Sequence, residues 1–219
     1  VPPAFFAAAA EAEFDSWLTI GVTDGSGGVS TAIAASPGFD IAALWTATTG
    51  LSETNSAVFY MDPGTMGANS GVAPIVMAQM TLSADDAASG TATAQLQGNP
   101  TDAAAEDWTY SATWTWSSST PPPPPPPPPP PSGGAESVTV VSTDGVAGMT
   151  TVRLSYTLDA TQANVYAMAG TSSTTMSFPP AYQVAAPFGA DIGGVPPAFF
   201  AAAAEAEFDS WLTIGVTDG

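Results

Sequence analysis

The sequence predicts an all-β fold, in which antiparallel β-sandwich modules are joined by a polyproline II linker and repeated in tandem. Three observations support this prediction. Short segments alternate apolar and polar residues between turns rich in glycine, proline and aspartate. Eleven consecutive prolines occupy residues 121–131. Residues 1–25, here called the first block, recur without a change as residues 195–219, the second block.

The alternating segments follow one another at short intervals, as is typical of antiparallel sandwiches. In the first block, alanines and glutamates at 4–14 follow two prolines and predict a short helix. The next segment, 16–22, predicts a strand with Leu18, Ile20 and Val22 on one face. The other predicted strands are 41–46, 57–61, 75–82, 91–97, 108–116, 138–142, 151–158 and 164–169.

The clearest alternation lies at 108–116. One face of this segment carries Ala112 and four large aromatic residues, and the other carries only threonine and serine. Four such side chains on one strand face need a core or an interface. The sequence leaves both open: a buried face, or a platform for carbohydrate or a protein partner. The four aromatic residues are Trp108, Tyr110, Trp114 and Trp116.

The proline run 121–131 does not fit inside a globular core, because each proline fixes its φ and lacks a backbone N–H. It predicts a polyproline II rod of roughly 34 Å. We therefore expect a spacer between two β-rich segments, 1–120 and 132–219. Each segment is expected to be a module, or part of one that a neighbouring repeat completes.

The two blocks indicate a tandem array. They are offset by 194 residues, so the chain reads as a window slightly longer than one period. The alternative is a short protein that carries a duplicated segment at both ends. In an array, a whole period runs from about Ser132 through the second block and on into a copy of residues 26–120.

Composition excludes several classes of function. The chain has no histidine or cysteine, and one arginine against twenty acidic residues gives a formal charge of −19. Nucleic acid and anionic membranes are therefore not expected as partners, and the usual catalytic bases and thiols are missing. No run of 18 apolar residues suggests a membrane span. The one cation, Arg153, is expected on a solvated strand face, paired with a carboxylate.

Carboxylates are the reactive groups that remain. The adjacent pairs Asp85-Asp86 and Glu106-Asp107 would point to opposite faces of a strand, so neither supplies the two facing carboxyl groups of a glycosidase. Thr-Asp-Gly triplets, as at 143–145, predict hairpin turns, with calcium ligation as the alternative. We expect no enzymatic activity, no cofactor and no specific metal site, although diffuse Ca²⁺ binding fits the acidic surface.

Sugar on this chain would have to be O-linked, because no asparagine lies in an acceptor sequon. The composition around the proline run is typical of a glycosylated stalk, with prolines as acceptors after hydroxylation. The candidate sites are Pro121, Pro122, Pro123, Pro124, Pro125, Pro126, Pro127, Pro128, Pro129, Pro130 and Pro131, with Ser119, Thr120 and Ser132 beside them.

A proline run bordered by serines, between acidic, cysteine-free β segments that repeat, resembles the hydroxyproline-rich structural glycoproteins of algal cell walls, flagellar hairs and extracellular fibrils. The amino-acid sequences of residues 57–63, 178–184 and 187–194 also resemble repeated modules in very long surface proteins of algae and related protists. The resemblance implies prolyl hydroxylation, O-glycans on the run and no enzymatic activity. Proline runs also serve as ligands of SH3-type and profilin-like domains.

These observations predict a non-enzymatic structural protomer of an extracellular or cell-surface glycoprotein fibril. Its partners would be other copies of itself, joined head to tail, and covalent O-linked glycans. The alternative is a surface adhesin or carbohydrate-binding repeat that uses the aromatic face at 108–116. A hydrolase is the third and least supported reading of the sequence.

Overall fold

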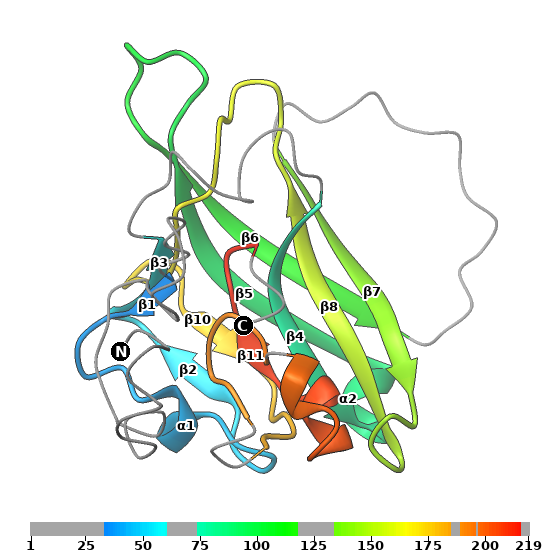
Figure 1. Ribbon diagram of the computed structural model, residues 1–219. Helices are drawn as coiled ribbons and strands as arrows, with labels where there is room; N and C mark the ends of the chain where they lie inside the picture. The colour runs from blue at the N-terminus through cyan, green and yellow to red at the C-terminus, as the bar shows by residue number, and fades with distance from the viewer. Residues whose placement is uncertain (1–32, 61–73, 118–133, 185–188, 196, 216–219) are drawn as a thin grey trace, which may run out of the picture.

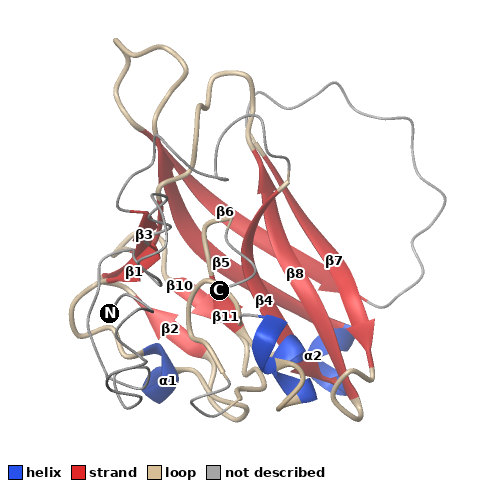
Figure 2. Cartoon of the chain, in the orientation of Figure 1, coloured by secondary structure: helices blue, strands red, loops and turns tan. Residues whose placement is uncertain are grey.

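The computed structural model describes residues 33–60, 74–117, 134–184, 189–195 and 197–215. They form two β-sheets with few, short helices, and the predicted all-β class is confirmed (Figure 2). Within these ranges, every pair of named strands is antiparallel. The strands are β1 (Ile33–Ala35), β2 (Leu51–Glu53), β3 (Ser56–Tyr60), β4 (Ile75–Ser83), β5 (Ser89–Gly98), β6 (Trp108–Ser117), β7 (Ala135–Thr143), β8 (Met149–Thr157), β9 (Ala167–Gly170), β10 (Met176–Phe178) and β11 (Trp211–Leu212). The helices are α1 (Ile41–Leu44), α2 (Ala84–Ala88) and the 3₁₀ helices η3 (Pro197–Phe199) and η4 (Ala204–Phe208).

The larger sheet has seven strands and is built around the long hairpin of β5 and β6 (Figure 1). These two strands pair along their whole length, from Ser89 opposite Ser117 to Gly98 opposite Trp108. The other edge of β5 pairs with both β10 and β9. Beyond them, β10 pairs with β2, whereas β9 pairs with β3 and β3 with β1.

The smaller sheet has the order β11-β4-β8-β7. Its long strands β4 and β8 pair from Ile75 opposite Tyr156 to Ser83 opposite Met149. The loop between β7 and β8 contains Asp144, whose φ of 65° is left-handed, and the Gly148 N–H donates to the Asp144 carboxylate at 2.9 Å. The turn predicted at 143–145 is therefore part of a real hairpin.

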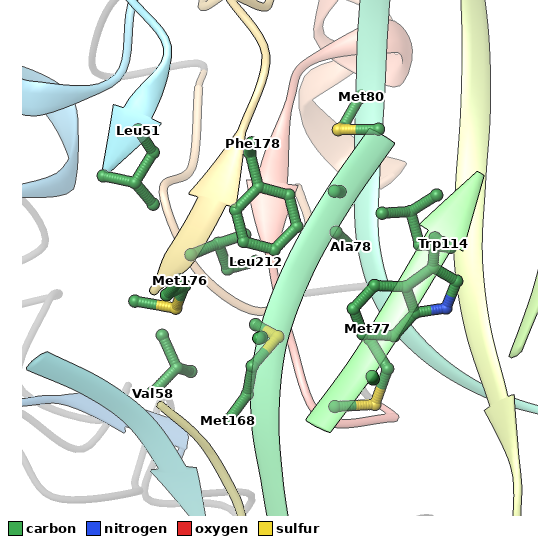
Figure 3. Packing of buried hydrophobic residues seen from close by; sticks show 14 of the residues in the cluster. Leu51, Val58, Met77, Ala78, Met80, Trp114, Met168, Met176, Phe178 and Leu212 are labelled. Carbon is green, nitrogen blue, oxygen red and sulfur yellow. The ribbon is translucent and has the colours of Figure 1, made fainter. Parts of the chain in front are cut away.

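The two sheets face each other across one main core. Trp114 of β6 is fully buried, and its Nε1 donates to the carbonyl oxygen of Ser155 in β8 at 2.8 Å. Figure 3 shows side chains from both sheets in this interior, among them Met168 of β9 and Met80 of β4. Packing of apolar faces from both sheets therefore stabilises the fold.

Strands from both sides of the proline run belong to each sheet. In the larger sheet, β9 and β10 pair with strands that precede the run, and in the smaller sheet β8 pairs with β4. The segments 1–120 and 132–219 each supply part of one β unit. The run itself lies outside the described residues, in the connection from β6 to β7.

Most of the predicted strands are confirmed. Those at 57–61, 75–82, 91–97, 108–116, 138–142 and 151–158 correspond to β3 through β8, with ends shifted by a few residues. The strand predicted at 164–169 begins later, as β9. The prediction missed three strands of three residues each, β1, β2 and β10, together with the helix α2.

The strand predicted at 41–46 is wrong, because α1 lies there. Asp40 caps this helix: the Ala43 N–H donates to the Asp40 carboxylate at 3.1 Å. Ile41 and Trp45 are both buried and lie four positions apart, which places them on one face of a helical turn. The Trp45 Nε1 also donates to the Pro179 carbonyl at 2.7 Å, which ties this turn to the sheet.

The second block also differs from its prediction, whereas the first block lies outside the described residues. The positions equivalent to the predicted helix hold two short 3₁₀ helices, η3 and η4. Ala203 and Ala206 are buried three positions apart, which matches three residues per 3₁₀ turn. The strand is only β11, and its neighbours Ser210 and Thr213 are buried as well, so the block is covered on both faces.

Candidate functional site

The second block completes the edge of the smaller sheet. Trp211 lies opposite Gln79 and Leu212 opposite Ala78 in an antiparallel pair. Past the strand, the Thr213 N–H donates to the Met77 carbonyl at 2.8 Å and the Gly215 N–H to the Val76 carbonyl at 2.7 Å. We call the surface of β4 and β8 that receives the block the docking site.

The block contributes large apolar side chains to both of its faces. Leu212 and Ile214 are fully buried and belong to the main core, in which Figure 3 labels Leu212 among side chains from both sheets. Trp211 is 2% exposed and lies on the opposite side of the strand, near Arg153. Burial of each such side chain contributes about 2 kcal/mol. The block is therefore an integral part of the unit.

Polar side chains of β4 bind the main chain of the block. The Gln79 amide donates to the carbonyl oxygens of Asp209, at 2.9 Å, and Glu207, at 3.1 Å. The Thr81 hydroxyl donates to the Phe208 carbonyl and lies 2.7 Å from the Thr151 hydroxyl. Gln79, Thr81 and Thr151 are all buried, so these hydrogen bonds lie away from water, where leaving one unmade is costly.

Arg153 connects β8 to this network. Its Nε donates to the Gln79 Oε1 at 3.0 Å, and its guanidinium carbon lies 5.8 Å from the centre of the Trp211 ring. The predicted solvated face is wrong, because the block covers this face of β8 and Thr151 beside it is 1% exposed. Within the described residues, Arg153 meets an amide and an indole where the sequence predicted a carboxylate. Among the described residues, the arginine thus orients the glutamine that binds the block.

The block carries a buried carboxylate, Asp209. Its Oδ1 accepts the N–H groups of Val184 and Ser210, at 2.7 and 2.9 Å, and its Oδ2 accepts the Ala190 N–H at 2.7 Å. Burial raises the pKa of Asp209 to about 6, although the three N–H donors favour the charged form, and nearby Asp191 raises it further. Asp209 thereby ties the segment before the block to the block itself.

Close packing supports this contact. A Cβ on Gly189 would collide with the Val184 carbonyl oxygen and meet an Asp209 oxygen. Glycine at this position therefore lets the backbone approach the carboxylate. A small cavity of about 250 Å³ remains between Arg153, Trp211 and the residues Val195, Phe200 and Ala206.

The predicted aromatic face points inward. Trp114 is in the core, and Trp108, Tyr110 and Trp116 are partly buried against it. Trp108 stacks on Tyr156 of β8 with ring centres 6.1 Å apart. The remaining indole N–H groups also have acceptors: that of Trp108 donates to Asn99 O and that of Trp116 to Asp86 O, both at 2.9 Å. The face joins the two sheets.

A second cavity, of about 620 Å³, opens at the end of β6 where the proline run is attached. Trp116, Thr115 and Ser117 of β6 line it on one side, and Val138 and Val140 of β7 on another. Val140 is 59% exposed. One aromatic side chain of the predicted face therefore reaches a hollow that a ligand could enter.

The other predicted sites have these positions. The proposed acceptors in 119–132 lie outside the described residues. Asp86 accepts the Ser83 hydroxyl at 2.7 Å at the start of α2, while the Tyr166 hydroxyl donates to Asp107 at 2.8 Å. In the described ranges, no three acidic side chains gather as a metal site would require.

Sequence reasoning did not identify the docking site. Gln79 and Thr81 lie in a strand predicted correctly, but nothing in its alternation marks side chains that bind a segment about 130 positions away. The only available signal was the repetition of the block. In the part of the chain that the structure describes, no helix has the length and apolar character needed to cross a membrane. No protein-family model, curated protein or solved structure matches this chain.

Proposed function

We propose that this chain is a repeat unit of a non-enzymatic, extracellular structural fibril, and that each unit is closed by a block. The observation that supports the proposal is the docked second block: β11 pairs with β4, and Trp211 and Leu212 are buried. An identical sequence stands 194 residues earlier. In an array, the first block would close the preceding unit in the same way.

Head-to-tail continuity then follows from the position of the block. A segment built into one unit and continuing into the next would connect the two, and the sheet edge holds this segment as far as Gly215. Force along the chain would act on the β11–β4 pairing and on the hydrogen bonds of Gln79 and Thr81. The proposed mechanism is mechanical: packed β units resist extension.

The proline run is proposed to cover the unit from the side. It connects β6 to β7, and the Glu136 carboxylate of β7 accepts the Thr113 N–H of β6 at 3.2 Å. The chain thus enters and leaves the run on one unit, which favours a sheath over an in-line spacer. A rod of roughly 34 Å carrying sugars would keep neighbouring fibrils apart.

Peptide mass spectrometry of the native protein across 117–134 tests the glycoprotein part. We expect hydroxylated prolines carrying sugar. Unmodified prolines would remove this part of the proposal. Electron microscopy of the native material tests the fibril part: regular filaments are expected, and isolated particles would contradict it.

A carbohydrate-binding repeat is the second candidate, and the cavity beside Trp116 favours it. An indole with hydroxyl groups around it, here Thr115, Ser117 and Thr150, is a chemistry that binds sugars. The inward orientation of the other three aromatic residues removes the broad platform expected from the sequence. Glycan binding that is lost in Trp116→Ala and retained in Thr109→Ala, an exposed position on the other face, would support it.

A further inference from the structure

The docking site is a sheet edge that requires a partner. Without the block, the carbonyl oxygens of Val76 and Met77 would lose the N–H groups of Gly215 and Thr213. The Thr81 N–H would lose the Ser210 hydroxyl, which lies at 2.9 Å. An unpaired edge above an apolar core binds strands readily.

The groups that fill this site are also present in the first block. Asp209, Ser210, Trp211 and Leu212 correspond, at an offset of 194, to Asp15, Ser16, Trp17 and Leu18. The remaining contacts use the main chain of Glu207, Phe208, Thr213 and Gly215, and these too have identical counterparts. The two blocks therefore have the same chemical complementarity to the docking site.

The topology permits exchange. β11 lies at the end of its sheet and pairs only with β4 among the named strands, so its departure leaves the pairing of the other strands intact. The block contacts the docking site mainly through its own buried side chains and main chain. An identical block arriving from another molecule would find every one of these partners.

We infer that the docking site binds the first block of a second copy of this chain when its own second block is absent or displaced. The inference rests on the proposed function and names the partner that would join separate chains within the fibril. In a single intact chain the tethered second block is favoured, because tethering gives it a high effective concentration. Exchange would link chains end to end.

The two blocks provide matched variants of the 219-residue chain. Trp211→Ala removes the anchor from the second block and leaves the first intact, whereas Trp17→Ala does the reverse. We expect Trp211→Ala to associate with increasing concentration, with the mass from light scattering rising to at least twice that of the monomer. Wild type, Trp17→Ala and the double variant should stay monomeric under the same conditions. A folded Trp211→Ala chain that remains monomeric would overturn the inference.

A labelled peptide with the sequence of residues 195–215 measures the same contact directly. It should bind Trp211→Ala about thirtyfold more tightly than the same peptide with its tryptophan replaced by alanine, as for a buried hot-spot residue. Binding to wild type should be weaker, since the site is occupied. Equal binding by the two peptides would overturn the inference.

If Trp211→Ala unfolds on its own, the peptide must restore its near-ultraviolet circular dichroism, and failure to do so counts against the inference. If the exchange experiments give negative results, the proposal of a tandem array is not affected. Filaments and modified prolines in the native material test that proposal separately, so the two can fail independently.

Discussion

The β5–β6 hairpin and the docked second block are held in the unit by different means. Ten residues of each hairpin strand pair without a break, and the aromatic face between them packs against the other sheet. The block has a strand of two residues, and side chains of β4 bind its main chain one group at a time. The hairpin therefore depends on continuous strand pairing and packing, and the block on a few buried apolar side chains together with individually placed polar groups.

This difference predicts two kinds of failure. A substitution that removes a buried side chain of the hairpin weakens the core that both sheets share, and it should therefore unfold the whole unit. Damage to the docking site should release the block while the hairpin persists, because local openings need less free energy than global unfolding. The following predictions test that distinction.

Trp114→Ala should have the largest effect. The side chain is fully buried between the sheets, and its removal leaves a large cavity and takes away the hydrogen bond from its indole to the Ser155 carbonyl. We expect the free energy of unfolding to fall by about 4 kcal/mol, measured by urea denaturation. Thr113→Val, at an exposed position on the same strand, should change it by less than about 0.5 kcal/mol. A small loss in Trp114→Ala would refute the role assigned to the aromatic face.

The hairpin was predictable because alternation over nine residues leaves one consistent arrangement of the faces. The segment Trp108–Trp116 could be assigned as a strand from its own residues, without knowledge of contacts with residues far away in the sequence. The three-residue strands β1 and β10 are too short for such a pattern. They form by pairing with distant strands, β1 with β3 and β10 with both β2 and β5. At 41–46, the cap supplied by Asp40 and the buried pair Ile41 and Trp45 override an apolar stretch that suits a strand.

The docking site could not be predicted in this way. Its contacts join Gln79 and Thr81 to positions about 130 residues later, and local composition carries no sign of that pairing. Nor does it show that Arg153 would meet an amide and an indole instead of a carboxylate. The α2 helix did carry a local signal: Ser83 followed by Asp86 forms a capping pair that the sequence prediction overlooked.

The second prediction concerns pH and acts on the block. The pKa of Asp209 rises from 3.8 to about 6 in the folded chain. Because the folded pKa is the higher one, this group's stabilisation is complete below pH 3.8 and is lost as the pH rises through about 6. From this group alone we expect a loss of about 3 kcal/mol in unfolding free energy between acid and neutral pH.

The matched control is again in the chain. Asp209→Asn should flatten this part of the pH profile, and Asp15→Asn, at the identical position of the first block, should leave the profile of the single chain unchanged. Denaturation across pH 4 to 7.5 provides the comparison. Equal effects of the two substitutions would contradict the assignment to the docked block.

Thr81→Val should have a smaller and more local effect. The substitution removes the hydroxyl that donates to Phe208 O and deprives the Thr151 hydroxyl of its neighbour. We expect about 2 kcal/mol less protection of amides in the block, measured by hydrogen exchange, with little change in β5 and β6. Thr109→Val, at an exposed position, is the control. Uniform loss of protection over the whole chain would count against a separately held block.

Arg153→Lys should have the smallest effect, and it tests whether the block can lose stability while the β5–β6 hairpin does not. A lysine has no donor at the position of Nε and no planar group to lie over Trp211, so Gln79 Oε1 loses its partner although the charge is kept. We expect the block amides to lose about 1 kcal/mol of protection. Without the Arg153 contact, the Gln79 side chain is held less firmly in the orientation in which its amide donates to the carbonyl oxygens of Asp209 and Glu207. If β5 and β6 lost as much protection as the block, the guanidinium would be stabilising the whole unit, and the separate role assigned to it at the block would be wrong.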